Sequence, residues 1–168
     1  MIAFIPGSFD PVTFGHLDII YRATELYDKV VIAVLVNESK VGMFTLKERV
    51  ELIKKSIEIM KINDANIEIV MFEGLLVSFI QTYEGKKIIV KGLRTVTDYE
   101  YELQMAHLNR DLGIETSLMV TLPEYSYISS SMVKSVAKLG GDVGTYVPHN
   151  VARAVYEFMD RENEKNRS

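Results

Sequence analysis

The residues best suited to chemistry stand near the amino terminus, in the stretch Gly7-Ser-Phe-Asp-Pro-Val-Thr-Phe-Gly-His16. It follows an apolar run, Ile2–Ile5, which is typical of a short buried strand and is expected to end at Pro6-Gly7. Pro11 keeps the chain out of helical geometry, and apolar residues recur at three- and four-residue steps only after Thr13. A strand, a glycine turn and a helix start bring free backbone N–H groups and the positive end of a helix dipole together. The stretch therefore predicts a site for phosphate.

His16 would lie in the first turn of that helix, where its imidazole can hydrogen-bond a phosphate oxygen. For this histidine alone, the alternative is a local hydrogen bond at the helix end with no part in chemistry. Lys40, in the polar stretch from Asn37 to Gly42, offers a cation, although a lysine in a loop is commonly just solvated. The combination of glycine, serine, aspartate, proline and histidine favours the functional interpretation of His16.

A second group of cations directly follows a predicted buried strand, Lys87–Val90. It is the segment Lys91-Gly-Leu-Arg94, in which the glycine allows close backbone approach and Arg94 offers a planar fork suited to phosphate. The alternative is a structural ion pair with Asp98 or Glu102. Because the segment follows a buried strand, its cations cannot disperse over a solvated face, and we favour anion binding.

Three hydroxyls gather in Tyr127-Ile-Ser-Ser-Ser131, just before an apolar periodicity that predicts a helix. Serine is a preferred N-cap, so a simple helix cap is the alternative. Beside the first motif, these hydroxyls and the free N–H groups of a helix start predict a second phosphate cradle. By contrast, Glu100 and Glu102 point to different helix faces, and His107 and His149 lack metal-ligand spacing. We therefore expect neither a paired-carboxylate hydrolytic site nor a metal site built from side chains.

Composition limits the class of protein. With 168 residues, 48% of them hydrophobic, the chain suits one domain, residues 1–168, whose tail from about 160 is expected to fray. It has no cysteine, which excludes disulfides, thiolate metal sites and cysteine nucleophiles. The formal net charge of -4 argues against a nucleic-acid partner and suits local cations that bind a small anion. We see no export signal and no apolar run of membrane length, so we expect a cytoplasmic protein.

Strand-like and helix-like segments alternate along the chain. The expected strands are Ile2–Ile5, Lys29–Val36, Ile67–Phe72, Lys87–Val90 and Ser117–Leu122. Helical patterns follow each strand, one of them opened by the capping box Thr45-Leu-Lys-Glu48, and a last helix follows Pro148. This order predicts an α/β fold with a doubly wound parallel sheet. Such sheets bind ligands beyond the carboxyl ends of the strands, where the strand order reverses, so the motifs above should face one crevice.

The sequence also resembles a known family. Thr13-Phe-Gly-His16 matches the (Thr/His)-x-Gly-His signature of the nucleotidylyltransferase superfamily. From Phe4 to about Pro148, the chain is similar to the bacterial phosphopantetheine adenylyltransferases of that superfamily. Besides the first motif, the matching blocks are Met43-Phe-Thr-Leu-Lys-Glu-Arg-Val50, Lys91-Gly-Leu-Arg-Thr-Val-Thr-Asp-Tyr-Glu-Tyr-Glu102, His107-Leu-Asn-Arg110 and Ile128-Ser-Ser-Ser-Met-Val-Lys134.

The resemblance implies transfer of the adenylyl group of ATP to 4'-phosphopantetheine, giving dephospho-coenzyme A and pyrophosphate, with Mg²⁺ bound through the ATP phosphates. It implies a single-domain Rossmann-like sheet of five strands in the order 3-2-1-4-5, a C-terminal helix and a homohexamer. A phosphate oxygen of the acceptor would attack the α-phosphorus in line, without a covalent enzyme intermediate. The alternatives are a related enzyme that uses CTP or nicotinamide mononucleotide, and a non-catalytic nucleotide sensor.

Position by position, the resemblance also implies which residues form the site. The ATP side comprises Ser8, Phe9, His16, Gly92, Leu93, Arg94, Glu102, Tyr127, Ile128, Ser129, Ser130, Ser131, Met132 and Val133. The acceptor side comprises Ser8, Lys40, Leu76 and Lys91. The residues expected to act on the reacting groups are Ser8, His16, Lys40 and Arg94. Four positions depart from the family's common residues: Ser8 replaces threonine, Lys91 arginine, Tyr125 tryptophan and Lys138 arginine.

Overall fold

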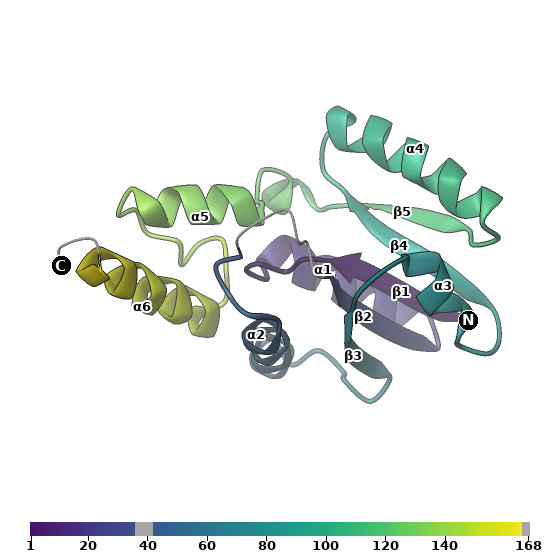
Figure 1. Ribbon diagram of the computed structural model, residues 1–168, viewed down its shortest axis with the longest axis horizontal. Helices are drawn as coiled ribbons and strands as arrows, with labels where there is room; N and C mark the ends of the chain where they lie inside the picture. Colours follow the sequence, from purple (N-terminus) through teal and green to yellow (C-terminus); the bar gives the residue numbers. More distant parts are fainter. Residues whose placement is uncertain (36–41, 166–168) are drawn as a thin grey trace.

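In the computed structural model, which describes residues 1–35 and 42–165, five parallel strands form one sheet in the order β3-β2-β1-β4-β5. The strands are β1 (Ile2–Gly7), β2 (Lys29–Leu35), β3 (Ile67–Phe72), β4 (Lys87–Leu93) and β5 (Thr116–Val120). The helices are α1 (Phe14–Leu26), α2 (Leu46–Ile59), α3 (Leu76–Gln81), α4 (Val96–Asp111), α5 (Ser130–Lys138) and α6 (His149–Lys165), with a short 3-10 helix, η1 (Pro123–Tyr125). The predicted fold class and strand order are confirmed, and α5 and α6 lie beyond the carboxyl end of β1 (Figure 1).

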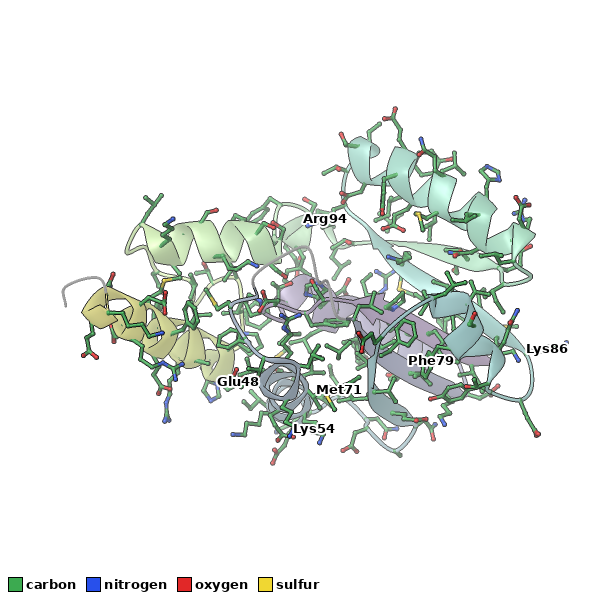
Figure 2. All side chains as sticks on the ribbon, viewed as in Figure 1. Glu48, Lys54, Met71, Phe79, Lys86 and Arg94 are labelled. Atoms are coloured by element: carbon green, nitrogen blue, oxygen red, sulfur yellow. The ribbon has the colours of Figure 1, made fainter. Side chains whose placement is uncertain are left out.

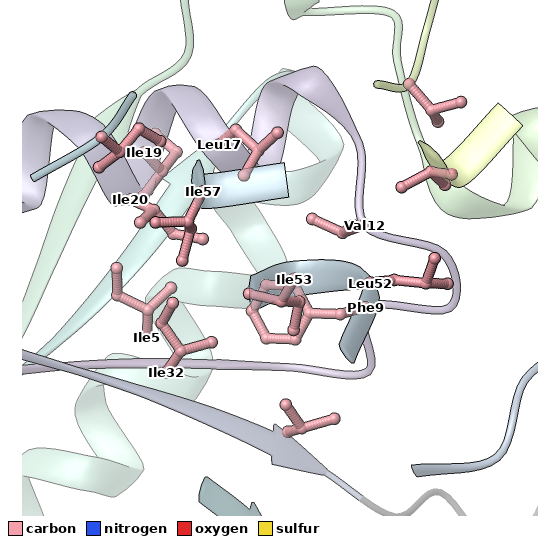
Figure 3. Packing of buried hydrophobic residues seen from close by; sticks show 14 of the residues in the cluster. Ile5, Phe9, Val12, Leu17, Ile19, Ile20, Ile32, Leu52, Ile53 and Ile57 are labelled. Carbon is pink, nitrogen blue, oxygen red and sulfur yellow. The ribbon is translucent and has the colours of Figure 1, made fainter. Parts of the chain in front are cut away.

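Helices pack on both faces of the sheet because its central strands carry apolar side chains on both. Alternate residues of a strand point to opposite faces, so Ala3 and Ile5 join the larger core while Phe4 joins the smaller one. The larger core includes residues of α1, α2, α5 and α6, and the smaller core includes residues of α3. Figure 3 shows part of the larger core, in which Phe9 of the first loop lies among residues of α1 and α2.

The strand β1 runs further than the sequence predicted. Pro6 and Gly7 still pair with Ala33 and Val34 of β2, so the predicted range Ile2–Ile5 was two residues too short, and the strand ends at Gly7. On its other side β1 pairs with β4 only from residue 2 to Phe4. Beyond that point one side of the strand has no ladder partner, so a proline without an N–H can be accommodated there. The loss of pairing between β1 and β4 lies where the strand order reverses, which is the predicted place for a crevice.

The strand β4 also runs further than expected, since residues 91–93 pair with residues 118–120 of β5. The strand was predicted to end at Val90, and this was wrong, because it continues to Leu93. The last strand is shorter than predicted, at Thr116–Val120. The charged tail is helical as far as Lys165, and residue 36, expected to end the second strand, lies outside the described residues.

Helix α4 contributes little to either core. Of its sixteen residues, all of which the structure describes, only Asn109 is buried. It exposes five large apolar side chains, Val96, Tyr99, Tyr101, Leu103 and Leu108, and Leu112 directly after the helix is exposed as well. In Figure 1 this helix lies on the far side of β5 from the rest of the sheet.

Within the described parts of the chain, no helix has the length and apolar character needed to cross a membrane.

Candidate active site

A pocket of about 290 Å³ opens at the carboxyl ends of β1 and β4. Its lining comes from the loop after β1, the start of α1, the end of β4, α4 and the start of α5. The predicted site residues that line it are Ser8, Phe9, His16, Lys91, Gly92, Arg94, Glu102, Ile128, Ser129, Ser130 and Ser131. The three motifs identified in the sequence therefore face one crevice, as the positions of the strand ends predicted.

Other predicted site residues lie elsewhere. Those that do not line the pocket are Leu76, Leu93, Tyr127, Met132 and Val133. Leu76 packs against the smaller core, Met132 packs against the larger core, and Val133 is fully buried within it. Tyr127 is exposed and its ring meets that of Tyr146 edge-on, with 6.3 Å between centroids. Lys40 lies outside the described residues.

The loop after β1 turns sharply at Phe9, whose φ of 46° lies in the left-handed region. A bulky residue adopts this conformation only where the surrounding structure enforces it. The Phe9 side chain is buried, and its ring centroid lies 5.0 Å from that of His16. A Cβ at position 7 would come within 3.0 Å of the Phe9 ring, so Gly7 permits this close approach. The Asp10–Pro11 peptide bond is cis.

His16 takes part in capping helix α1. Thr13 is the N-cap residue, and its hydroxyl oxygen accepts a hydrogen bond from the His16 backbone N–H at 3.4 Å. The Thr13 N–H donates in return to Nδ1 of the His16 ring at 3.1 Å. Nδ1 is therefore the unprotonated nitrogen, and the neutral ring carries its proton on Nε2. The local hydrogen bond that the sequence offered as an alternative to function is present, and it fixes the tautomer of a side chain that lines the pocket.

Burial, together with the positive charge of Arg94, lowers the pKa of His16 from 6.5 to about 4. We expect NMR of the imidazole nitrogens to show a neutral ring, protonated on Nε2, until the pH falls close to 4. Because the unfolded chain takes up this proton at higher pH, the stability that the neutral ring provides is complete above about pH 6.5 and is lost as the pH falls through 4. Protonation of His16 between pH 6 and 7 would contradict this assignment.

Both cations of the second motif are paired with carboxylates of α4. Nε of Arg94 donates to Oδ2 of Asp98 at 2.9 Å, and Nη1 donates to the carbonyl oxygen of Ile128 at 3.1 Å. Nζ of Lys91 lies 3.4 Å from Oε1 of Glu102. The ion pairs considered as an alternative to function are thus present, yet both cations line the pocket. Figure 2 shows Arg94 near the start of α5.

The three serines at the start of α5 have different surroundings. Ser129 is the N-cap residue, and its hydroxyl accepts a hydrogen bond from the Met132 N–H at 3.1 Å. The Ser130 hydroxyl donates to the carbonyl oxygen of Pro11 at 2.8 Å. Ser131 is exposed, and its hydroxyl has no hydrogen-bond partner within the described parts of the chain. The helix-cap interpretation therefore applies to Ser129, and Ser131 presents a hydroxyl that is available to a ligand.

The sequence analysis missed a buried carboxylate next to the pocket. Asp10 is only 4% exposed, and its two oxygens accept backbone N–H bonds from Met43 and Phe44, both at 2.9 Å. Nζ of Lys134 lies 3.1 Å from Oδ2, and Nε of Arg49 lies 3.4 Å from Oδ1. The sequence did carry a signal for it, because Asp10 is the single charged residue in the otherwise uncharged stretch from Gly7 to His16. Pocket-lining residues also missed as site candidates are Ile5, Pro6, Gly7, Thr13, Gly15, Ile19, Val90 and Thr121.

Known proteins resemble this chain in sequence and in fold. A sequence model of the cytidylyltransferase-like family matches residues 4–136. The phosphopantetheine adenylyltransferase of Clostridium perfringens is 51% identical over 154 residues, which cover 90% of this chain and 91% of that protein. The enzyme of the same name from Alkaliphilus metalliredigens is 50% identical over 156 residues, covering 92% and 96%.

Among solved structures, a Vibrio parahaemolyticus protein assigned as a nicotinate-nucleotide adenylyltransferase matches with a TM-score of 0.68 over 94% of each chain. Its sequence identity of 17% makes this a likeness of fold alone. The family model and the relatives of about half identity, which span nearly the whole chain, are more specific. The chain belongs to the phosphopantetheine adenylyltransferase family, within the cytidylyltransferase-like proteins.

Proposed function

We propose that this chain transfers the adenylyl group of ATP to 4'-phosphopantetheine, forming dephospho-coenzyme A and pyrophosphate. The observation that carries the proposal is the convergence of His16, Arg94 and the start of α5 on one pocket. An imidazole N–H, a guanidinium and the free N–H groups of a helix start are all donors to phosphate oxygens. The relatives that are 50% and 51% identical bear the name of an enzyme with this reaction.

In this reaction, an oxygen of the acceptor phosphate attacks the α-phosphorus of ATP. A new P–O bond forms while the bond from the α-phosphorus to the bridging oxygen breaks, and the electron pair leaves with pyrophosphate. A phosphate oxygen is nucleophilic near neutral pH, so the protein has to position the two substrates and stabilise the developing charge. We assign donation to the reacting phosphates to His16 and Arg94, with Ser8 beside them and Lys40 on the acceptor side.

The lowered pKa of His16 suits this role. At a pKa of about 4, the ring stays neutral at the pH of a cell, so Nε2–H can donate a hydrogen bond without giving up its proton. A neutral donor stabilises charge on a phosphate oxygen in the transition state, and it does not act as a general base. The Thr13 N–H, which occupies Nδ1, keeps the donor edge of the ring available to the pocket.

Glu102 brings a buried carboxylate oxygen to the pocket that has no partner among the described residues. Oε2 of Glu102 is buried and accepts no hydrogen bond within the described residues, while Oε1 faces Lys91. A buried carboxylate oxygen without a donor is costly, so it is expected to be satisfied by a ligand or by water. A hydroxyl or amino group of a bound nucleotide could donate the missing hydrogen bond to this oxygen. This supports placing Glu102 on the ATP side.

Magnesium enters this proposal as part of the substrate. Mg²⁺ commonly keeps several waters and binds through substrate phosphates, whose charge it neutralises. Residues 1–35 and 42–165 contain no group of three or more His, Asp or Glu side chains that could hold a metal. The donors around the pocket are cations, N–H groups and hydroxyls, which suit the phosphates of a Mg²⁺–ATP complex.

The test is release of pyrophosphate by the purified chain with Mg²⁺, comparing ATP with CTP and 4'-phosphopantetheine with nicotinamide mononucleotide. We expect the pair of ATP and 4'-phosphopantetheine to exceed every other pair by at least about tenfold, equivalent to about 1.4 kcal/mol of transition-state discrimination. A faster reaction with CTP or with the mononucleotide would replace the proposed substrates. Binding of ATP without pyrophosphate release from any pair would indicate a nucleotide sensor.

The serine cluster allows binding and capping to be separated. Ser131→Ala should lower kcat/KM for ATP by roughly tenfold, about 1.4 kcal/mol, with an unchanged melting temperature. Ser129→Ala should lower the free energy of unfolding by about 0.5–2 kcal/mol because α5 loses its N-cap. Ser135→Ala, an exposed change on the same helix, is the control and should affect kinetics little. Wild-type kinetics for Ser131→Ala would contradict a ligand role for that hydroxyl.

We further propose that the chain acts as a homohexamer in the cytoplasm, where ATP is supplied. The exposed apolar side chains of α4 support association, because monomers rarely leave a large apolar patch in water. Light scattering after gel filtration should give about six times the chain mass of 19.1 kDa. A monomeric mass at micromolar concentration would remove this part of the proposal.

A further inference from the structure

The buried carboxylate of Asp10 joins three segments that are far apart in the sequence. Its oxygens accept the N–H groups of Met43 and Phe44 just before α2, and Oδ2 also accepts from Nζ of Lys134 in α5. A buried carboxylate is stable only when its charge is paired and its lone pairs are satisfied. Two amides and two cations, Lys134 and Arg49, meet that requirement.

Neighbouring contacts tie the same segments together. Nη1 of Arg49 donates to the carbonyl oxygen of Ser8 at 3.2 Å, and Nε donates to that of Phe44 at 2.8 Å. The Ser130 hydroxyl donates to the carbonyl oxygen of Pro11 at 2.8 Å. The residues on both sides of Asp10 are therefore held to α2 and to α5, and Asp10 is the only side chain among these that contacts both.

The residue directly before Asp10 needs such an anchor. Phe9 has a φ of 46°, a left-handed conformation that is unfavourable for an aromatic residue. Its buried ring contacts the ring of His16, and the preceding Ser8 lines the pocket. Relaxation of this turn would displace Ser8 and remove the packing that holds His16.

We propose that Asp10 is a positioning residue for adenylyl transfer: its carboxylate holds the strained Ser8–Phe9 turn against α5 so that Ser8 and His16 face Ser131 in one geometry. The inference rests on the proposed function. Asp10 does not line the pocket, so it acts through these neighbours and not on the substrates. Misplacement of reacting groups by about 1 Å can lower a rate by about 10²-fold.

The test is Asp10→Asn, which keeps the size of the side chain but replaces one acceptor oxygen with an N–H₂ donor. That donor must face either the Phe44 N–H and Arg49, or the Met43 N–H and the Lys134 ammonium, so at least one arm of the junction is lost. We expect kcat with ATP and 4'-phosphopantetheine to fall by about 10²-fold while the Kd for ATP changes by less than about fivefold. Hydrogen exchange at the Met43 and Phe44 amides, measured without substrates, should become faster.

Glu68→Gln is the matched control, since it makes the same chemical change in a carboxylate that pairs with Lys29 at 2.6 Å and accepts from the Tyr83 hydroxyl at 3.0 Å. These residues lie outside the pocket, so this variant should keep its kcat. If Asp10→Asn fails to fold, Lys134→Gln decides. The Lys134 side chain is 34% exposed, and replacing it removes only the contact between Asp10 and α5. We expect kcat of this variant to fall at least about threefold while its affinity for ATP is unchanged.

Three results would overturn the role of Asp10. They are a kcat within about threefold of wild type in folded Asp10→Asn, a kcat loss matched by an equal loss of ATP affinity, and an equal loss in Glu68→Gln. If Asp10→Asn does not fold, a wild-type kcat in Lys134→Gln would overturn the role of Asp10 instead. A wild-type chain without turnover would remove the proposed function and this role together. Wild-type turnover beside an equally active Asp10→Asn removes the role of Asp10 alone.

Discussion

His16→Ala should lower kcat with ATP and 4'-phosphopantetheine by roughly 10²–10³-fold, the loss typical of removing one donor to a charge that develops in the transition state. The substitution removes Nε2–H, which the bond from Thr13 to Nδ1 leaves free for the pocket. Because the donor is neutral, the loss should be similar across the neutral pH range. Steady-state kinetics at saturating substrates, at several pH values from 6 to 9, make this measurement.

The same substitution also removes half of the capping box of α1, so its effect on stability must be measured separately. The Thr13 hydroxyl still accepts the backbone N–H of residue 16, and we expect a loss of only about 0.5–2 kcal/mol in the free energy of unfolding. His107→Ala is the matched control, because His107 is exposed on α4 and outside the pocket. A kcat within about threefold of wild type for a folded His16→Ala would contradict the assignment.

Arg94→Ala should lower kcat/KM for ATP by about 10²-fold, since it removes a guanidinium that lines the pocket and brings a positive charge to the phosphates. Arg94→Lys should recover only part of this loss, because an ammonium keeps the charge but not the planar fork. The measurement is initial rates over a range of ATP concentrations, with the acceptor saturating.

The structural part of the Arg94 effect can be isolated with Asp98→Asn. That variant breaks the ion pair at 2.9 Å but leaves the guanidinium and its bond to the Ile128 carbonyl oxygen. We expect its kcat/KM to stay within about threefold of wild type. Arg110→Ala provides a second control, since that arginine pairs with Glu115 at the far end of α4 and is 61% exposed. Equal losses in Asp98→Asn and Arg94→Ala would reduce Arg94 to a structural role.

The order of the elements could be predicted because each strand carries a continuous apolar run and each helix an apolar stripe. The ends of the strands could not be predicted, because they depend on whether a neighbouring strand is present to pair with the last residues. Pro6 stays in β1 because only β2 pairs with it, and Lys91 stays in β4 because β5 extends alongside. Turn residues mark a possible end, whereas a partner strand decides whether the ladder continues.

The position of the site was predictable for the same reason, since residues at the carboxyl ends of parallel strands must lie on one edge of the sheet. Individual roles were less accessible. Three consecutive serines are equivalent in sequence, and only the position of the helix start shows that Ser129 is the cap and that Ser131 follows it as an exposed residue. The pairing of Asp10 with Lys134 spans 124 positions, so no local pattern could reveal it.

The short pairing between β1 and β4 has a consequence for redesign of the substrate range. The strand residues that line the pocket, 5–7 of β1 and 90–92 of β4, lie where the two strands are no longer paired with each other, and we call them the floor of the pocket. Even a methyl group at Gly92 would meet Ile19 at 3.1 Å, so the floor tolerates little added volume. A library meant to admit bulkier acceptors should therefore vary the rim, at the loops and helix starts, and leave the floor untouched.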